Sequence, residues 1–81
     1  MRVIGEVAHP SCKITLFAWN NKYLVKIEQG MLEQTYKISD YDVTGEADLR
    51  EMLSEAFLEK VLKRFAEMQR DWELVLEDIE D

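Results

Sequence analysis

The sequence has few of the residues that break or cross-link a chain: one cysteine, one proline and three glycines among 81 residues. A lone cysteine, Cys12, cannot form a disulfide within the chain, and this usage suits a reducing cytoplasm. No apolar run approaches the roughly 18 residues of a membrane span, and residues 1–20 lack the pattern of a signal peptide. With 47% hydrophobic residues the chain can form a core, and its length allows one domain. We therefore expect a single cytoplasmic domain over residues 1–81.

Positive charge is scarce in the second half of the chain. Residues 1–43 hold five basic and five acidic residues, whereas residues 44–81 hold five basic and twelve acidic ones. The whole net charge of −7 therefore lies in the second half, which should repel polyanions such as nucleic acids.

The first half alternates between apolar and polar residues with the period of β-strands. Asn20-Asn21 suits a two-residue hairpin turn, because asparagine tolerates a positive φ, and Gln29-Gly30 suits the next turn. Pro10 cannot continue a ladder and marks the first loop. The predicted strands are residues 2–8, 13–19, 22–28 and 31–38.

These turns fix a register. It pairs Arg2 with Trp19, Ile4 with Phe17, Phe17 with Leu24, Lys13 with Glu28 and Lys26 with Glu33. One face of the sheet, which includes Val3, then carries no charge, and all eight charged residues up to position 38 fall on the other face. Gln34 is the one strongly polar residue on the uncharged face, so it must find hydrogen-bond partners or lie at an edge.

From Ala47 onward the period changes to that of an amphipathic helix. Thr44 or Asp48 is able to cap its start. Ser54 is able to cap a restart, which would split a short helix over residues 46–53 from a long one.

The long helix should overrun the sheet. A helix over residues 55–79 is about 37 Å long, whereas strands of seven or eight residues span about 23–26 Å. The overhang of about two turns carries Trp72, Val75, Leu76 and Ile79. These side chains are too apolar to remain in water, so something should cover them.

Together these patterns predict an α+β fold: a four-stranded antiparallel β-meander over residues 2–38, followed by a helical region over residues 46–79 that packs on one face. The uncharged sheet face and the helix stripe are the two largest apolar surfaces, so they should meet. We expect Leu16, Val25 and Ile27 to lie under Phe57, Val61 and Phe65.

No group of residues indicates catalysis, a cofactor or a metal. His9 and Cys12 share one loop, but two ligands make no zinc site, and a nucleophilic pair would need an orienting group and an oxyanion hole. The carboxylates of the helical region follow its solvated face, and Gly5, Gly30 and Gly45 are too far apart for a phosphate loop. We therefore expect a protein that is not an enzyme and that holds no cofactor or metal.

The charged face of the sheet has no predicted cover within the chain. On it Ile4, Phe17, Trp19 and Leu24 would be neighbours, rimmed by lysines. Three interpretations are open. The face is an interface for another protein or a second copy, it stacks nucleobases on its aromatic rings while lysines meet phosphates, or its β-forming residues serve cross-strand pairing alone.

The residues favour a non-enzymatic protein-interaction module that self-associates through its C-terminal helix, its exposed sheet face or both. We expect a homodimer in which residues 72–79 contact the other subunit in an antiparallel, two-fold arrangement, because a parallel one would bring Glu73, Glu77 and Asp78 against their own copies. The interface residues would be Ile4, Phe17, Trp19, Leu24, Trp72, Val75, Leu76 and Ile79. The alternative is binding of single-stranded nucleic acid by the sheet face, which the net charge disfavours. No membrane partner is expected.

Two resemblances accompany these patterns. Gly5-Glu6-Val7, His9-Pro10, the run from Cys12 to Phe17, Trp19-Asn20 and the run from Ile27 to Gly30 together look like a family of small uncharacterised bacterial proteins. This resemblance covers most of the chain and implies a fold but no activity. In element order alone, four antiparallel strands followed by a helix also resemble the single-stranded-nucleic-acid proteins of the Whirly, PC4 and PUR type, which bind through dimers and sheet surfaces. The acidic helix departs from their basic balance.

Overall fold

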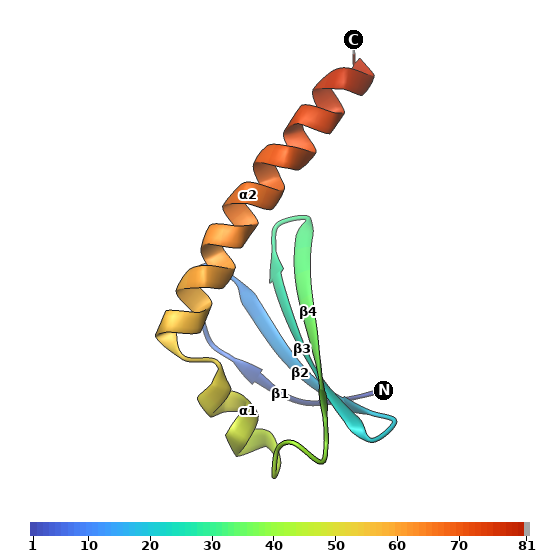
Figure 1. Ribbon diagram of the computed structural model, residues 1–81, viewed down its shortest axis with the longest axis vertical. Helices are drawn as coiled ribbons and strands as arrows, with labels where there is room; N and C mark the ends of the chain where they lie inside the picture. The colour runs from blue at the N-terminus through green and yellow to red at the C-terminus, as the bar shows by residue number, and fades with distance from the viewer. Residues whose placement is uncertain (81) are drawn as a thin grey trace.

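Four strands and two helices follow one another along the chain in a computed structural model that describes residues 1–80. The strands form one antiparallel sheet in the order β1-β2-β3-β4, and α2 lies across one face of it (Figure 1). The predicted α+β fold, the meander and the break in the helical region before Glu55 are confirmed. The elements are β1 (Arg2–Val7), β2 (Lys13–Trp19), β3 (Lys22–Gln29), β4 (Leu32–Ser39), α1 (Glu46–Met52) and α2 (Glu55–Glu80).

The turn between β2 and β3 lies where the sequence predicts it. Asn20 and Asn21 have φ angles of 49° and 60°, which is what a type I′ turn requires at both central residues. The two strands therefore pair in the predicted register, from Lys13 opposite Glu28 to Trp19 opposite Lys22.

The turn between β3 and β4 lies one residue later than predicted, at Gly30-Met31. Gly30 has a φ of 59° and occupies the first turn position, where a two-residue loop of this kind prefers glycine. The pairing of the strands moves by two residues, so that Lys26 lies opposite Thr35 rather than Glu33. Because the shift is even, every side chain keeps its predicted face.

The predicted register of β1 is wrong at its N-terminal end. Val3 lies opposite Phe17 and Gly5 opposite Leu16, so Ile4 is the extra residue of a β-bulge. A bulge reverses the facing of the residues that precede it. Ile4 therefore packs against the core, whereas Val3 is 58% exposed on the other face. By the same shift Arg2 lies opposite Ala18 rather than Trp19, so the prediction that all eight charged residues share the other face is wrong for Arg2.

The core lies between the uncharged face of the sheet and the two helices. Leu16, Val25 and Ile27 are buried together with Val61 and Phe65, as predicted. Phe57 is only partly buried and packs edge-on against Tyr36, with the two ring centroids 5.5 Å apart. The buried core residues are Ile14, Leu16, Val25, Ile27, Leu49, Leu53, Leu58, Val61 and Phe65.

The short helix α1 packs close to β1. A Cβ atom at Gly5 would lie 2.8 Å from a guanidinium nitrogen of Arg50, so the absence of a side chain at Gly5 permits this approach. The predicted cap by Thr44 or Asp48 is wrong, because the N-cap of α1 is Gly45 and no side chain caps it. The Asp48 carboxylate instead accepts hydrogen bonds from the Thr44 backbone N–H (2.8 Å) and hydroxyl (2.7 Å). These bonds hold the pKa of Asp48 below its ordinary value. The Ser54 hydroxyl accepts from the Phe57 N–H and caps α2.

Gln34 joins the sheet to α2 by hydrogen bonds. Its side-chain NH₂ donates to the backbone carbonyl of Val61 at 3.0 Å. Its carbonyl oxygen accepts from the Tyr36 hydroxyl and from an Arg64 guanidinium nitrogen, both at 2.9 Å. The one polar residue on the uncharged face thus has its partners, and those partners fix the position of α2 over β4.

The helix α2 runs past the sheet, as its length predicts. Met68 is the last of its residues that packs on the core, and residues 69–79 are all exposed. This second part of α2 projects beyond the β3–β4 hairpin (Figure 1). The molecule is accordingly elongated, with extents of 50 × 26 × 18 Å.

Truncation of Phe65 to alanine tests the packing of α2 on the sheet. Phe65 is fully buried, so Phe65→Ala should lower the free energy of unfolding by about 3–5 kcal/mol in urea denaturation. The control is Leu74→Ala, at an exposed position of α2 beyond the sheet, which should change it by about 0.5 kcal/mol or less. An unchanged melting temperature for Phe65→Ala would contradict this packing.

Candidate interaction surfaces

The open sheet face is the face of the sheet turned away from α1 and α2. Near the Asn20-Asn21 turn it is apolar, because Val3, Phe17 and Leu24 lie side by side on β1, β2 and β3. Lys37 ends this row on β4. Leu24 is only 7% exposed although it does not belong to the core cluster. Its neighbours on the face therefore cover it, so within this row Val3 is exposed, Phe17 is partly buried and Leu24 is closed to a partner.

Trp19 is the main exposed aromatic residue of the open sheet face. It lies opposite Lys22 in the next row, and it is 41% exposed. The Lys22 ammonium lies 5.3 Å from the centre of the Trp19 ring, a distance at which the ring quadrupole attracts the cation. The lysine thus covers part of the surface that a partner or a nucleobase would use.

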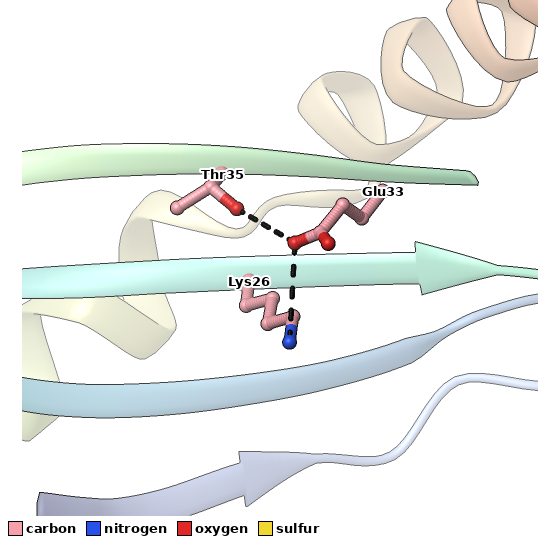
Figure 2. A network of polar contacts seen from close by, with 3 residues as sticks. All are labelled: Lys26, Glu33 and Thr35. Atoms are coloured by element: carbon pink, nitrogen blue, oxygen red, sulfur yellow. Dashed lines mark hydrogen bonds and ion pairs between the residues drawn. The ribbon is translucent and has the colours of Figure 1, made fainter. Parts of the chain in front are cut away.

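The other half of the open sheet face is charged and solvated. Lys26 lies 3.9 Å from Glu33, and the Thr35 hydroxyl donates to the same carboxylate oxygen at 3.2 Å (Figure 2). Glu28 lies directly opposite Glu33 on the neighbouring strand, and Lys13 lies opposite Glu28. Because these side chains are exposed or only partly buried, a pair such as Lys26–Glu33 contributes about 1 kcal/mol or less. This half resembles an ordinary solvated surface.

The helix extension, residues 69–79 of α2, carries a group of exposed apolar side chains. Trp72, Val75, Leu76 and Ile79 are 50%, 45%, 39% and 74% exposed. Their spacing of three and four residues places them on one stripe of the helix. The structure thus brings these four predicted interface residues together. On the sheet, by contrast, Ile4 faces the core, Leu24 is buried and Phe17 is partly buried.

Other exposed apolar residues were not expected at a surface site, and besides Met1, Val3 and Met52 there are three of them. Met31 is 98% exposed at the tip of the β3–β4 hairpin, Tyr41 is 94% exposed in the loop before α1, and Leu74 is 53% exposed on α2. Leu74 lies about 200° from Trp72 around the helix, so it faces away from the apolar stripe. The misplaced turn had put Met31 in a strand, which hid its position at the tip.

The loop between β1 and β2 holds His9 and Cys12. The ring nitrogen Nδ1 of His9 accepts a hydrogen bond from the Ser11 backbone N–H at 3.1 Å. Burial raises the pKa of the Cys12 thiol, which lowers its thiolate fraction and hence its reactivity. Across residues 1–80, no three His, Cys, Asp or Glu side chains gather as metal ligands would.

Neither helix combines, within residues 1–80, the length and the apolar character that crossing a bilayer requires. In comparisons with protein-family models, with curated proteins and with solved structures, the chain matches none of them. The interpretation of the two surfaces therefore rests on their own residues.

Truncation of Leu24 tests whether the apolar row on the open sheet face covers itself. Leu24→Ala should lower the free energy of unfolding by about 2–3 kcal/mol, at the low end for a buried leucine because neighbours on an open face can close over the gap. Val3→Ala, in the same row but exposed, should cost about 1 kcal/mol or less. Equal effects of the two substitutions in urea denaturation would show that Leu24 is not covered.

Proposed function

We propose that this protein is a non-enzymatic, cytoplasmic protein-interaction module that self-associates as a homodimer, with residues 72–79 contacting the other subunit. The observation that carries the proposal is the helix extension. It holds four apolar side chains on one stripe, and all four are at least 39% exposed. An apolar stripe of this kind on a surface helix is typical of a binding face.

The two halves of α2 differ in what covers their apolar residues. Leu58, Val61 and Phe65 are buried by the sheet, whereas Trp72 and Ile79 have no sheet beneath them. A helix end without tertiary contacts is only marginally stable in water. A second copy that covered the stripe would stabilise the helix extension and remove its apolar surface from water.

The open sheet face supports self-association less well. In its apolar row Leu24 is buried and Phe17 is partly buried, which leaves Val3 exposed, and Lys22 covers part of Trp19. Of the two predicted surfaces, the helix extension is therefore the one that we assign to the interface.

Removal of residues 72–81 tests the proposal. Of the residues that the structure describes, the truncated chain keeps all that pack on the core, so it should fold. It should be a monomer at tens of micromolar when its mass is measured by light scattering. The full chain should be a dimer under the same conditions. The truncated chain should also melt at a lower temperature, because a dimer is stabilised by association of the folded state. A truncated chain that still dimerises with equal affinity would show that residues 72–79 are not the interface.

Two adjacent substitutions control for the change in charge and length. Val75→Glu places a carboxylate on the apolar stripe and should abolish the dimer, because burial of an unpaired charge is costly. Leu74→Glu makes the same change in charge on the opposite side of the helix and should leave the dimer intact. Both positions are about half exposed in the chain, so both variants should fold.

Nucleic-acid binding by the open sheet face is the alternative, and Trp19 beside Lys22 is the feature that supports it. With a net charge of −7, we expect no retention of a single-stranded oligonucleotide at physiological salt in a fluorescence-anisotropy titration. Tight binding that falls steeply with salt, and that loses about 1–3 kcal/mol in Trp19→Ala, would favour the alternative instead.

A further inference from the structure

We infer that two copies of the chain pair antiparallel along one apolar seam of α2, with Trp72 of one copy against Val75 of the other. The inference rests on the proposed self-association and adds its geometry. The seam is a set of residues separated alternately by three and four positions, the spacing of a coiled coil. Its members are Leu58, Val61, Phe65, Met68, Trp72, Val75 and Ile79.

The first part of this seam is already an interface. Leu58, Val61 and Phe65 are buried against the sheet, and Met68 is partly buried at the end of the core. The seam then continues without interruption into the exposed residues of the helix extension. In a straight helix such a seam drifts by about 20° per seven residues, so between Phe65 and Ile79 it turns by only about 40°. The bare part of the seam is its exposed residues Trp72, Val75 and Ile79. It therefore lies on the side of α2 that faces the sheet.

This direction excludes a parallel partner. In a parallel pair, each seam would have to face the other along its whole length, and the two sheets would then occupy the same space between the helices. In an antiparallel pair the two sheets lie at opposite ends, because the helix extension projects beyond the sheet (Figure 1). Only the bare parts of the two seams overlap, and the pair closes on itself with two-fold symmetry.

The length of the bare seam also fixes the register. An antiparallel pair centred between Glu73 and Leu74 places Trp72 against Val75 and Met68 against Ile79, and the two-fold axis repeats both layers. A register shifted by seven residues toward the sheet would require Phe65, which is fully buried. A shift of seven residues in the opposite direction, away from the sheet, would leave only two layers of paired side chains between the helices. The central register therefore uses every exposed residue of the seam together with the partly buried Met68, and none of the fully buried residues.

The same register accounts for the exposed methionine at the hairpin tip. It brings Ile79 of one copy to Met68 of the other, and Met68 and Leu32 are both partly buried residues that pack against the core. Leu32 directly follows Met31, which is 98% exposed. The C-terminal end of each α2 thus reaches the β3–β4 hairpin of the other copy, where Met31 provides apolar surface.

Charges beside the seam make the register testable. Asp71 and Asp78 occupy the same flank of the seam, seven residues apart, and in an antiparallel pair a flank faces its own kind. Asp71 of one copy therefore lies beside Asp78 of the other, and the two carboxylates repel each other. Glu77 lies about 140° from Trp72 around the helix and faces away from the seam.

A distance measurement between the two copies tests the orientation. The full chain with Cys12→Ser and Glu59→Cys carries one nitroxide label on the exposed, outward side of α2. Pulsed electron–electron double resonance then measures the distance between the labels of the two copies. The antiparallel register places the two positions about 44 Å apart along the helices, since each lies 14.5 residues from the centre. A parallel pair would place them within about 25 Å, and a shift by seven residues would change the separation by about 10 Å.

Charge reversal supplies a second, independent measurement. Asp78→Lys should lower the dissociation constant of the dimer about threefold or more, because it replaces two repulsions with two attractions. Glu77→Lys makes the same change in net charge and should have a smaller effect. A label separation near 44 Å with stronger association of Asp78→Lys supports the inference. A dimer with a short separation overturns the inference and leaves the proposed self-association standing, whereas a monomeric mass at tens of micromolar overturns both.

Discussion

One interface holds this fold together: the uncharged face of a four-stranded sheet against the apolar stripe of α2. Apart from Arg2, which the bulge turns, the sheet places its charged residues on the other face, so this interface takes most of its apolar residues. Gln34 then fixes where α2 lies by bonding to the carbonyl of Val61 and to Arg64. Because the stripe turns by only about 40° between Phe65 and Ile79 and is longer than the strands, the interface also decides the direction in which the exposed part of the stripe faces. The candidate interface is thus positioned by the core itself.

Most of the fold could be predicted because it is specified by the strand period of the first half, the helix period of the second half and the Asn20-Asn21 turn. Asn20-Asn21 fixes the β2–β3 register, and the even shift at the β3–β4 turn leaves the faces unchanged. The bulge at Ile4 could not be predicted in this way. Strict alternation gives residues 2–8 a regular strand, and only packing shows that the isoleucine, rather than Val3, occupies the core. Alternation describes a strand well until one extra residue reverses it.

The two candidate surfaces differed in how well sequence could predict them. The helix extension follows from a comparison of lengths, which needs no side-chain contacts, and Trp72 and Ile79 lie where that comparison places them. The apolar residues of the sheet face required knowledge of what surrounds each one. Leu24 lies between Phe17 and Lys37 in its row and is buried, and no pattern in the sequence distinguishes such a residue from an exposed one.

Charge and steric exclusion act together on the helix extension in the pairing that we propose. An exposed apolar stripe invites association with any similar surface, and open-ended association leads to fibres. Here Asp71 and Asp78 flank the stripe, so each contact must overcome repulsion and random contacts are weakened. The sheet blocks the seam at one end, which leaves room for a single partner. An apolar stripe with acidic flanks and one closed end therefore favours a reversible pair over an aggregate.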